Sequence, residues 1–228
     1  MDRHFDQDLK ALEKKILDMG ALCESMIQKT VKALVERDRN LTEEVFSMEE
    51  EANRLHIEID ETVVKLLALH QPMAVDLRFL TAAMKVNTDL ERIADMAVNA
   101  GQTGYYHLFK EPPVPQLAMI TRMAEIAQKM LRESLDAYAR RDVALAQRVL
   151  VEDEEEDRLK AKALTELISL IRTDPPRSEA FVELILLSKN MERIGDHATN
   201  IAEDVVYMVL GKDIRHQGAA GKTSTSPL

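Results

Sequence analysis

Two short stretches of this chain carry acidic and amide side chains at the spacing of one helical turn. The two rows are Glu91, Asp95 and Asn99 in DLERIADMAVN, and Glu192, Asp196, Asn200 and Glu203 in NMERIGDHATN. Residues four apart on a helix lie on one face with Cβ atoms ~5–6 Å apart, so each row would gather oxygen atoms. Clustered carboxylates suit hard cations, or iron and manganese held through oxygen.

A related spacing occurs on the segment before each row. Glu49 and Asn53 are four apart, and so are Asp153 and Asp157. If each pair of segments packs as antiparallel helices, the oxygen atoms of both would meet. The sequence therefore predicts two metal sites that could take iron, manganese, zinc or magnesium. Their ligands would be Glu49, Asn53, Glu91 and Asp95 in the first site, and Asp153, Asp157, Glu192 and Asp196 in the second.

The structural alternative is that each stripe is a solvated helix face held by ion pairs. Arg92 precedes Asp95 by three residues, and Arg193 precedes Asp196 by three. Lys189 stands at the same spacing before Glu192. This alternative explains one stripe well, but it gives no reason for the same polar positions to match in two stretches.

Other site chemistries find little support in the residues. Cys23 is the only cysteine, which excludes an internal disulfide and a cysteine-based metal site. None of the six histidines follows a Glu by three residues, the spacing of a carboxylate-bridged di-iron enzyme. We expect His197 to be a polar residue on the flank of its helix, and no nucleophile stands beside a base.

The composition indicates an all-α protein without a nucleic acid partner. Aromatic residues make up 4% of the 228 residues, there is no Trp, and Gly and Pro number seven each. Good helix formers dominate instead. The formal charge of −10 disfavours binding to phosphate backbones. The charged N-terminus and the absence of a long apolar run predict a cytoplasmic protein.

Apolar residues recur at helical spacing along most of the chain. Six long helices are expected, at about residues 5–35, 40–69, 72–106, 116–138, 143–171 and 179–210. Asn40 is a candidate N-cap, Pro72 suits a first helical turn, and Gly211 suits a helix end. KEPPVP divides the chain into a first unit, 1–110, and a second, 111–211, followed by a polar tail, 212–228, that we expect to be disordered.

The two units align with each other. MIQKTVKALVERD ends at Asp38 and MLRESLDAYARRD ends at Asp142, 104 positions later. EEEANRL and DEEEDRL keep this offset, whereas Glu91 and Glu192 are 101 apart because the second unit has a shorter connection. The pattern predicts two tandem, pseudo-symmetric three-helix bundles that arose by duplication.

The duplicated ERI-[AG]-D phrase, each copy near the end of a three-helix unit, resembles the PhoU family of phosphate-transport accessory proteins. IDETVVKLLALHQPMAVDLR, residues 59–78, and GKDIRH, residues 211–216, also resemble segments of that family. The likeness extends to about Gly218. It implies a fold of two similar three-helix bundles, which agrees with the plan obtained from the periodicity.

The resemblance implies a cytoplasmic regulator that is not an enzyme. Its expected partners are the ATPase subunit of the phosphate transporter and a sensor histidine kinase, with the phosphate-starvation response held off when phosphate is plentiful. A homodimer is expected, and membrane contact only through partner proteins. Metal clusters bind to Glu/Asp-x-x-x-Asp motifs in the family, which here fall on the two predicted sites. Asn53 departs from the motif and weakens the first site. The alternative function is a carboxylate-bridged metal-binding protein, acting as a metal-dependent enzyme or a metal store.

Overall fold

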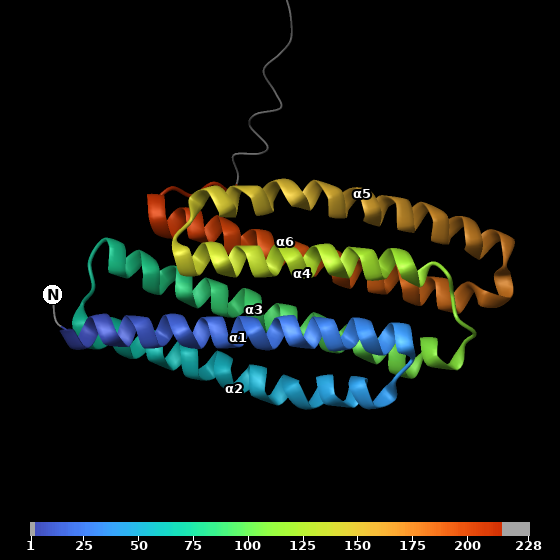
Figure 1. Cartoon of the computed structure of the whole chain (residues 1–228), viewed down its shortest axis with the longest axis horizontal. Helices are drawn as coiled ribbons and strands as arrows, with labels where there is room; N and C mark the ends of the chain where they lie inside the picture. Colours follow the sequence, from blue (N-terminus) through green and yellow to red (C-terminus); the bar gives the residue numbers. More distant parts are fainter. Residues whose placement is uncertain (1–2, 216–228) are drawn as a thin grey trace, which may run out of the picture.

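The computed structural model describes residues 3–215, which form six long α-helices and two short 3-10 turns, with no strand in that range (Figure 1). The elements are α1 (Arg3–Glu36), α2 (Arg39–His70), α3 (Val75–Tyr106), η1 (Leu108–Lys110), α4 (Leu117–Arg140), α5 (Val143–Thr173), η2 (Pro175–Arg177) and α6 (Ser178–Leu210). The all-α prediction with six long helices is therefore confirmed.

The helix ends differ from the expectation at two places. Asp38, not Asn40, caps α2, because its side chain accepts from the backbone N–H groups of Asn40 and Leu41. Pro72 lies in the loop before α3, since the chain reaches helical geometry only after Ala74, whose φ is +48°. Gly211 ends α6 as predicted, with a φ of +68° that favours glycine.

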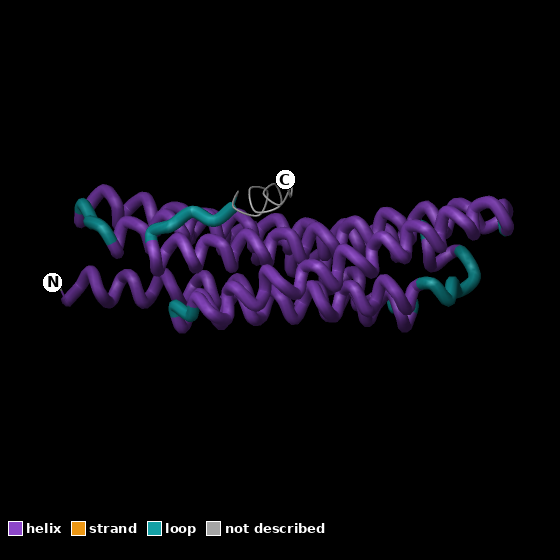
Figure 2. The backbone as a smooth tube through the Cα atoms, turned by 90° about the horizontal axis from the view of Figure 1, so that it is seen from above, coloured by secondary structure: helices purple, strands orange, loops and turns teal. Residues whose placement is uncertain are grey.

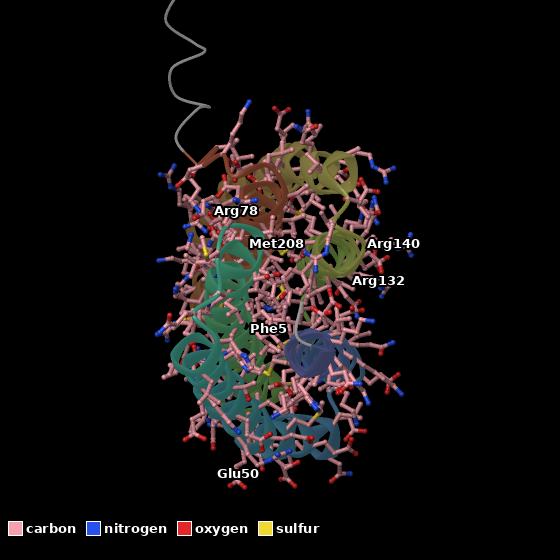
Figure 3. All side chains as sticks on the ribbon, turned by 90° about the vertical axis from the view of Figure 1, so that its left-hand side faces the viewer. Phe5, Glu50, Arg78, Arg132, Arg140 and Met208 are labelled. Atoms are coloured by element: carbon pink, nitrogen blue, oxygen red, sulfur yellow. The ribbon has the colours of Figure 1, made fainter. Side chains whose placement is uncertain are left out.

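The helices form two three-helix units that pack side by side (Figure 1), and all six helices run along one long axis (Figure 2). Within each unit the three helices pack on one another. Between units, α3 packs along α6 and α1 packs along α4, so α2 and α5 lie on the outside. Viewed end-on, Arg78 of α3 lies near Met208 of α6, and its Nε donates to the Met208 carbonyl at 3.3 Å (Figure 3).

Apolar side chains from all six helices form one continuous core. Ala, Leu, Ile, Val and Met dominate it, which reflects the scarcity of aromatic residues in the sequence. No helix in residues 3–215 is both long and apolar enough to cross a membrane. Most of the expected tail, 212–228, lies outside the described residues; Arg215, which is described, contacts the buried carboxylate of Asp204 at 2.7 Å.

Candidate functional site

The second predicted site comes together on the outer side of the second unit, where α5 packs against α6. Lys160 of α5 forms an ion pair with Glu192 of α6, and this contact fixes how the two helices are aligned. Asp157 and Asp153, one and two turns before Lys160, then lie along α6 toward Asp196. The four predicted side chains are close enough to act on one another electrostatically.

The carboxylates of this cluster repel one another and are only partly solvated. Partial burial, together with the charges of Asp157, Asp196 and Glu192, raises the pKa of Asp153 to about 6. The pKa of Asp196 is also raised, by partial burial and then by Glu192. Lys160 offsets some of this repulsion. A cation would relieve the remainder, because an opposite charge favours the ionised carboxylates.

Glu156 belongs to the same cluster, and the sequence analysis missed it. Its side chain is 1% exposed, and among the described residues neither carboxylate oxygen has a hydrogen-bond partner. Burial, and then the charges of Asp153 and Asp196, raise the pKa of Glu156 to about 9. An unpaired buried carboxylate is costly unless it is neutral or meets a cation.

Gly195 makes the room that Glu156 occupies. A Cβ atom added at Gly195 would lie 1.9 Å from Glu156 Oε2. The internal alignment places Ala52 opposite Glu156 and Ala94 opposite Gly195 in the first unit. An apolar Ala–Ala pair in one unit thus corresponds to a carboxylate in a glycine cradle in the other, a difference that was visible in the aligned sequences.

The first predicted site is built differently. Tyr105 donates to Glu43, and Asn87 donates to Asp60, so α2 and α3 run antiparallel and place Asn53 in the region of Asp95. Arg92, however, contacts both Glu91 and Asp95, at 3.4 and 3.3 Å. The Arg92–Asp95 ion pair of the structural alternative is present, and the single charge of Arg92 offsets part of the charge of these two carboxylates without a metal.

The ion pairs that the structural alternative offered for the second unit are absent among the described residues. Within residues 3–215, Arg193 does not pair with Asp196, nor Lys189 with Glu192. Glu192 instead turns toward Lys160 on the neighbouring helix. His197 lies on the flank of α6 toward α3, where its Nδ1 is 2.7 Å from Asp89 Oδ1.

Only the second site therefore has features that fit a metal ion. Across residues 3–215 no three His, Cys, Asp or Glu side chains already stand in a metal-holding arrangement. The second site nevertheless offers five carboxylates, and both oxygens of Glu156 lack a partner among the described residues. An all-oxygen donor set suits magnesium, manganese or iron better than softer ions. The first site offers three carboxylates, Glu49, Glu91 and Asp95, and Arg92 contacts the last two, while Ala52 and Asn53 supply none.

Comparison with known proteins finds one family along nearly the whole chain. The family model for the PhoU domain matches twice, at residues 16–103 and 120–205. A phosphate-specific transport system accessory protein PhoU homolog from Pseudomonas aeruginosa is 36% identical over 219 residues, which cover 96% of this chain and 90% of the relative. A homolog of the same description from Caulobacter vibrioides is 35% identical over 215 residues, 94% of each chain.

Solved structures agree with the fold. The crystal structure of PhoU from Pseudomonas aeruginosa superposes with a TM-score of 0.88 at 36% identity and covers 91% of this chain and 100% of its own. The phosphate transport system regulatory protein PhoU from Streptococcus pneumoniae gives a TM-score of 0.84 at 25% identity, covering 92% of this chain and 99% of its own.

Proposed function

Because the chain belongs to the PhoU family, we propose that it regulates phosphate uptake and phosphate homeostasis and is not itself an enzyme. It would hold the phosphate-starvation response off when phosphate is plentiful. Its partners would be the ATPase subunit of the phosphate transporter and a sensor histidine kinase. We place this action in the cytoplasm, with the protein as a homodimer that meets the membrane only through its partners.

The observation that carries this proposal is the double match to the PhoU domain, with both three-helix units present and nearly full coverage of accessory-protein relatives. The fold also suits an adaptor. Six parallel and antiparallel helices expose two long outer helices, α2 and α5, together with the ends of the bundle. Such a surface can meet more than one partner at a time.

A gene deletion tests the regulatory role. Deletion should raise expression of a phosphate-starvation reporter in phosphate-replete medium, and a copy of the gene supplied in trans should restore repression. Affinity purification of the tagged protein from replete cells should recover the transporter ATPase and the kinase. Repression that persists in the deletion strain would contradict the proposal.

We further propose that the second carboxylate cluster binds a metal ion, with Glu156 as an additional ligand. Asp153, Asp157, Glu192 and Asp196 would supply the other oxygen atoms. The metal would neutralise the mutual repulsion of these carboxylates and tie α5 to α6. This tie is structural in an adaptor, whereas in the alternative function, a metal store or metal-dependent enzyme, the metal would be the cargo or the reactive centre.

The duplicated fold supplies a matched control for this second proposal. Metal-free protein should melt at a higher temperature when manganese or iron is added, with a gain of ~2.7 kcal/mol at a hundredfold excess over Kd. Asp153→Asn with Asp196→Asn should remove this gain. Glu49→Gln with Asp95→Asn, the change at the equivalent positions of the first unit, should leave it intact. Equal gains in all three proteins would show that the metal binds elsewhere.

A further inference from the structure

A polar groove runs along the seam between the two units, on the side of α6 that faces α3. It has a volume of about 480 Å³ and is open to solvent. Lys189 and Arg193 line one wall from α6, and Gln102 and Thr103 line the other from α3. The groove is separate from the carboxylate cluster, which lies between α6 and α5.

The two cations of the groove have no acidic partner within residues 3–215. Lys189 and Arg193 are one helical turn apart and both are exposed. Like charges at this spacing repel each other. An anion with two negative charges placed between them would turn this repulsion into attraction.

Neutral hydrogen-bonding side chains line the groove together with these cations. Asn99 and Asn190 contribute amides from opposite walls, and Tyr106 contributes a hydroxyl at the end of α3. Glu183 is the one carboxylate among the described lining residues, and His107 lies over it, with Nδ1 3.4 Å from Glu183 Oε1. The balance of charge therefore favours an anion.

The other end of the same seam shows what the groove lacks. Lys85 pairs with Asp204 across the seam at 3.2 Å, and Asn200 donates to Asp89 at 3.1 Å. The repeat offset of 101 residues relates Asp89, Glu203 and Asp204 at that end to Asn190, Gln102 and Thr103 in the groove. Three carboxylates at one end are thus replaced by neutral groups at the other.

We propose that this groove binds a small molecule bearing a phosphate group. At neutral pH a phosphate group carries a charge of about −1.5 to −2 and several strong acceptor oxygens, which matches two cations and the neutral N–H and O–H side chains that line the groove. A carboxylate carries a single charge. Arg193 can bind two phosphate oxygens at once, while Lys189 acts as a point charge.

The preference for phosphate over other dianions rests on the proposed role in phosphate regulation. Two sources share this chemistry, free orthophosphate and a phosphate ester such as a nucleotide. The volume of the groove lies in the range of small-molecule sites and exceeds the need of a lone phosphate group.

Calorimetric titration of the purified, metal-free full-length protein tests the inference with orthophosphate, AMP and sulfate as separate probes. Binding of orthophosphate or AMP, but not of sulfate, supports it, and the stronger of the two identifies the source. Lys189→Gln with Arg193→Gln should weaken binding roughly tenfold or more. Asn190→Asp, which restores the acid found at the other end of the seam, should weaken it as well.

The control is Lys10→Gln with Lys14→Gln, which removes two exposed lysines at the same spacing on α1. This variant should bind like the unaltered protein. No binding of either phosphate probe, equal binding of sulfate, or unchanged binding by the groove variants would overturn the inference. The titration needs no transporter or kinase, so a protein that represses the starvation response but binds no phosphate refutes this inference alone.

Discussion

Replacing Glu156 by Gln should stabilise the metal-free protein, by an amount that grows with pH. In the folded protein the pKa of Glu156 is raised from 4.5 to about 9. Between these values the unfolded chain gives up a proton that the folded protein retains, so the free energy of unfolding falls by ~1.4 kcal/mol per pH unit. The stability is complete below pH 4.5 and is lost as the pH rises toward about 9.

At pH 7 the accumulated loss is about 3 kcal/mol, which Gln does not incur because it has no proton to release. For a chain of this size the gain corresponds to a rise in Tm of roughly 6–12 °C. Glu and Gln have nearly the same shape, so the glycine cradle at Gly195 accommodates both. Near pH 4.5 the two proteins should therefore unfold alike.

Urea unfolding of both proteins at pH 4.5, 6, 7 and 8, without metal, measures this difference. Glu154→Gln is the control, since Glu154 is exposed on the same helix and its replacement should change stability by less than about 0.5 kcal/mol. A Glu156→Gln variant that is no more stable at pH 8, or whose gain is the same at every pH, would refute the reasoning about burial.

Three further predictions concern packing, reactivity and a buried ion pair. Gly195→Ala should destabilise the fold by about 1–3 kcal/mol, because the new Cβ atom meets Glu156. Adding Glu156→Ala recreates the Ala52–Ala94 pair of the first unit and should recover most of the loss. A double-mutant cycle on the free energies of unfolding that shows no coupling would contradict this. Burial raises the pKa of the Cys23 thiol to about 12, so a thiol reagent at pH 8 should label Cys23 only when the protein unfolds. Fast labelling of the native protein would contradict the packing of α1. Arg215→Gln should lower the free energy of unfolding by about 1–3 kcal/mol at pH 7 and by less at pH 4, because burial raises the pKa of Asp204 and Arg215 opposes that shift. A loss of stability that does not depend on pH in urea unfolding would show that the ion pair is not the cause.

The helices could be predicted from the sequence because their signal is periodic and redundant. Apolar residues three and four apart define each buried face, and the duplication supplies that pattern twice. The cap of α2 was placed two residues late, although the repeat contained the answer. Asp38 and its equivalent Asp142 both occupy the N-cap position, and Asp142 accepts from the N–H of Leu145.

The candidate site was only partly predictable, because the spacing of residues along one helix does not determine which residues of the neighbouring helix they contact. Arg92 and Arg193 are equivalent in sequence, yet Arg92 closes over two carboxylates while Arg193 faces the seam with α3. Glu156 was missed because a charged residue in an acidic run is ordinarily exposed. Its alignment with Ala52, and that of Gly195 with Ala94, contained the signal.

The two units differ at the seam acids and at Glu156, and these two differences affect the stability of the fold unequally. The acids along the seam are buried but paired, because Asp89 contacts His197 and Asp204 contacts Lys85 and Arg215. Burying Glu156 where the first unit has Ala52 costs about 3 kcal/mol at pH 7 by the linkage above, a large share of the ~5–15 kcal/mol that stabilises a typical protein. A residue of that cost is hard to explain by packing, since an alanine fits the equivalent place. Coordination of a cation would remove this loss of stability by stabilising the ionised carboxylate. The destabilisation by Glu156 in the metal-free protein is therefore itself an argument that the second cluster, and not the first, is the functional one.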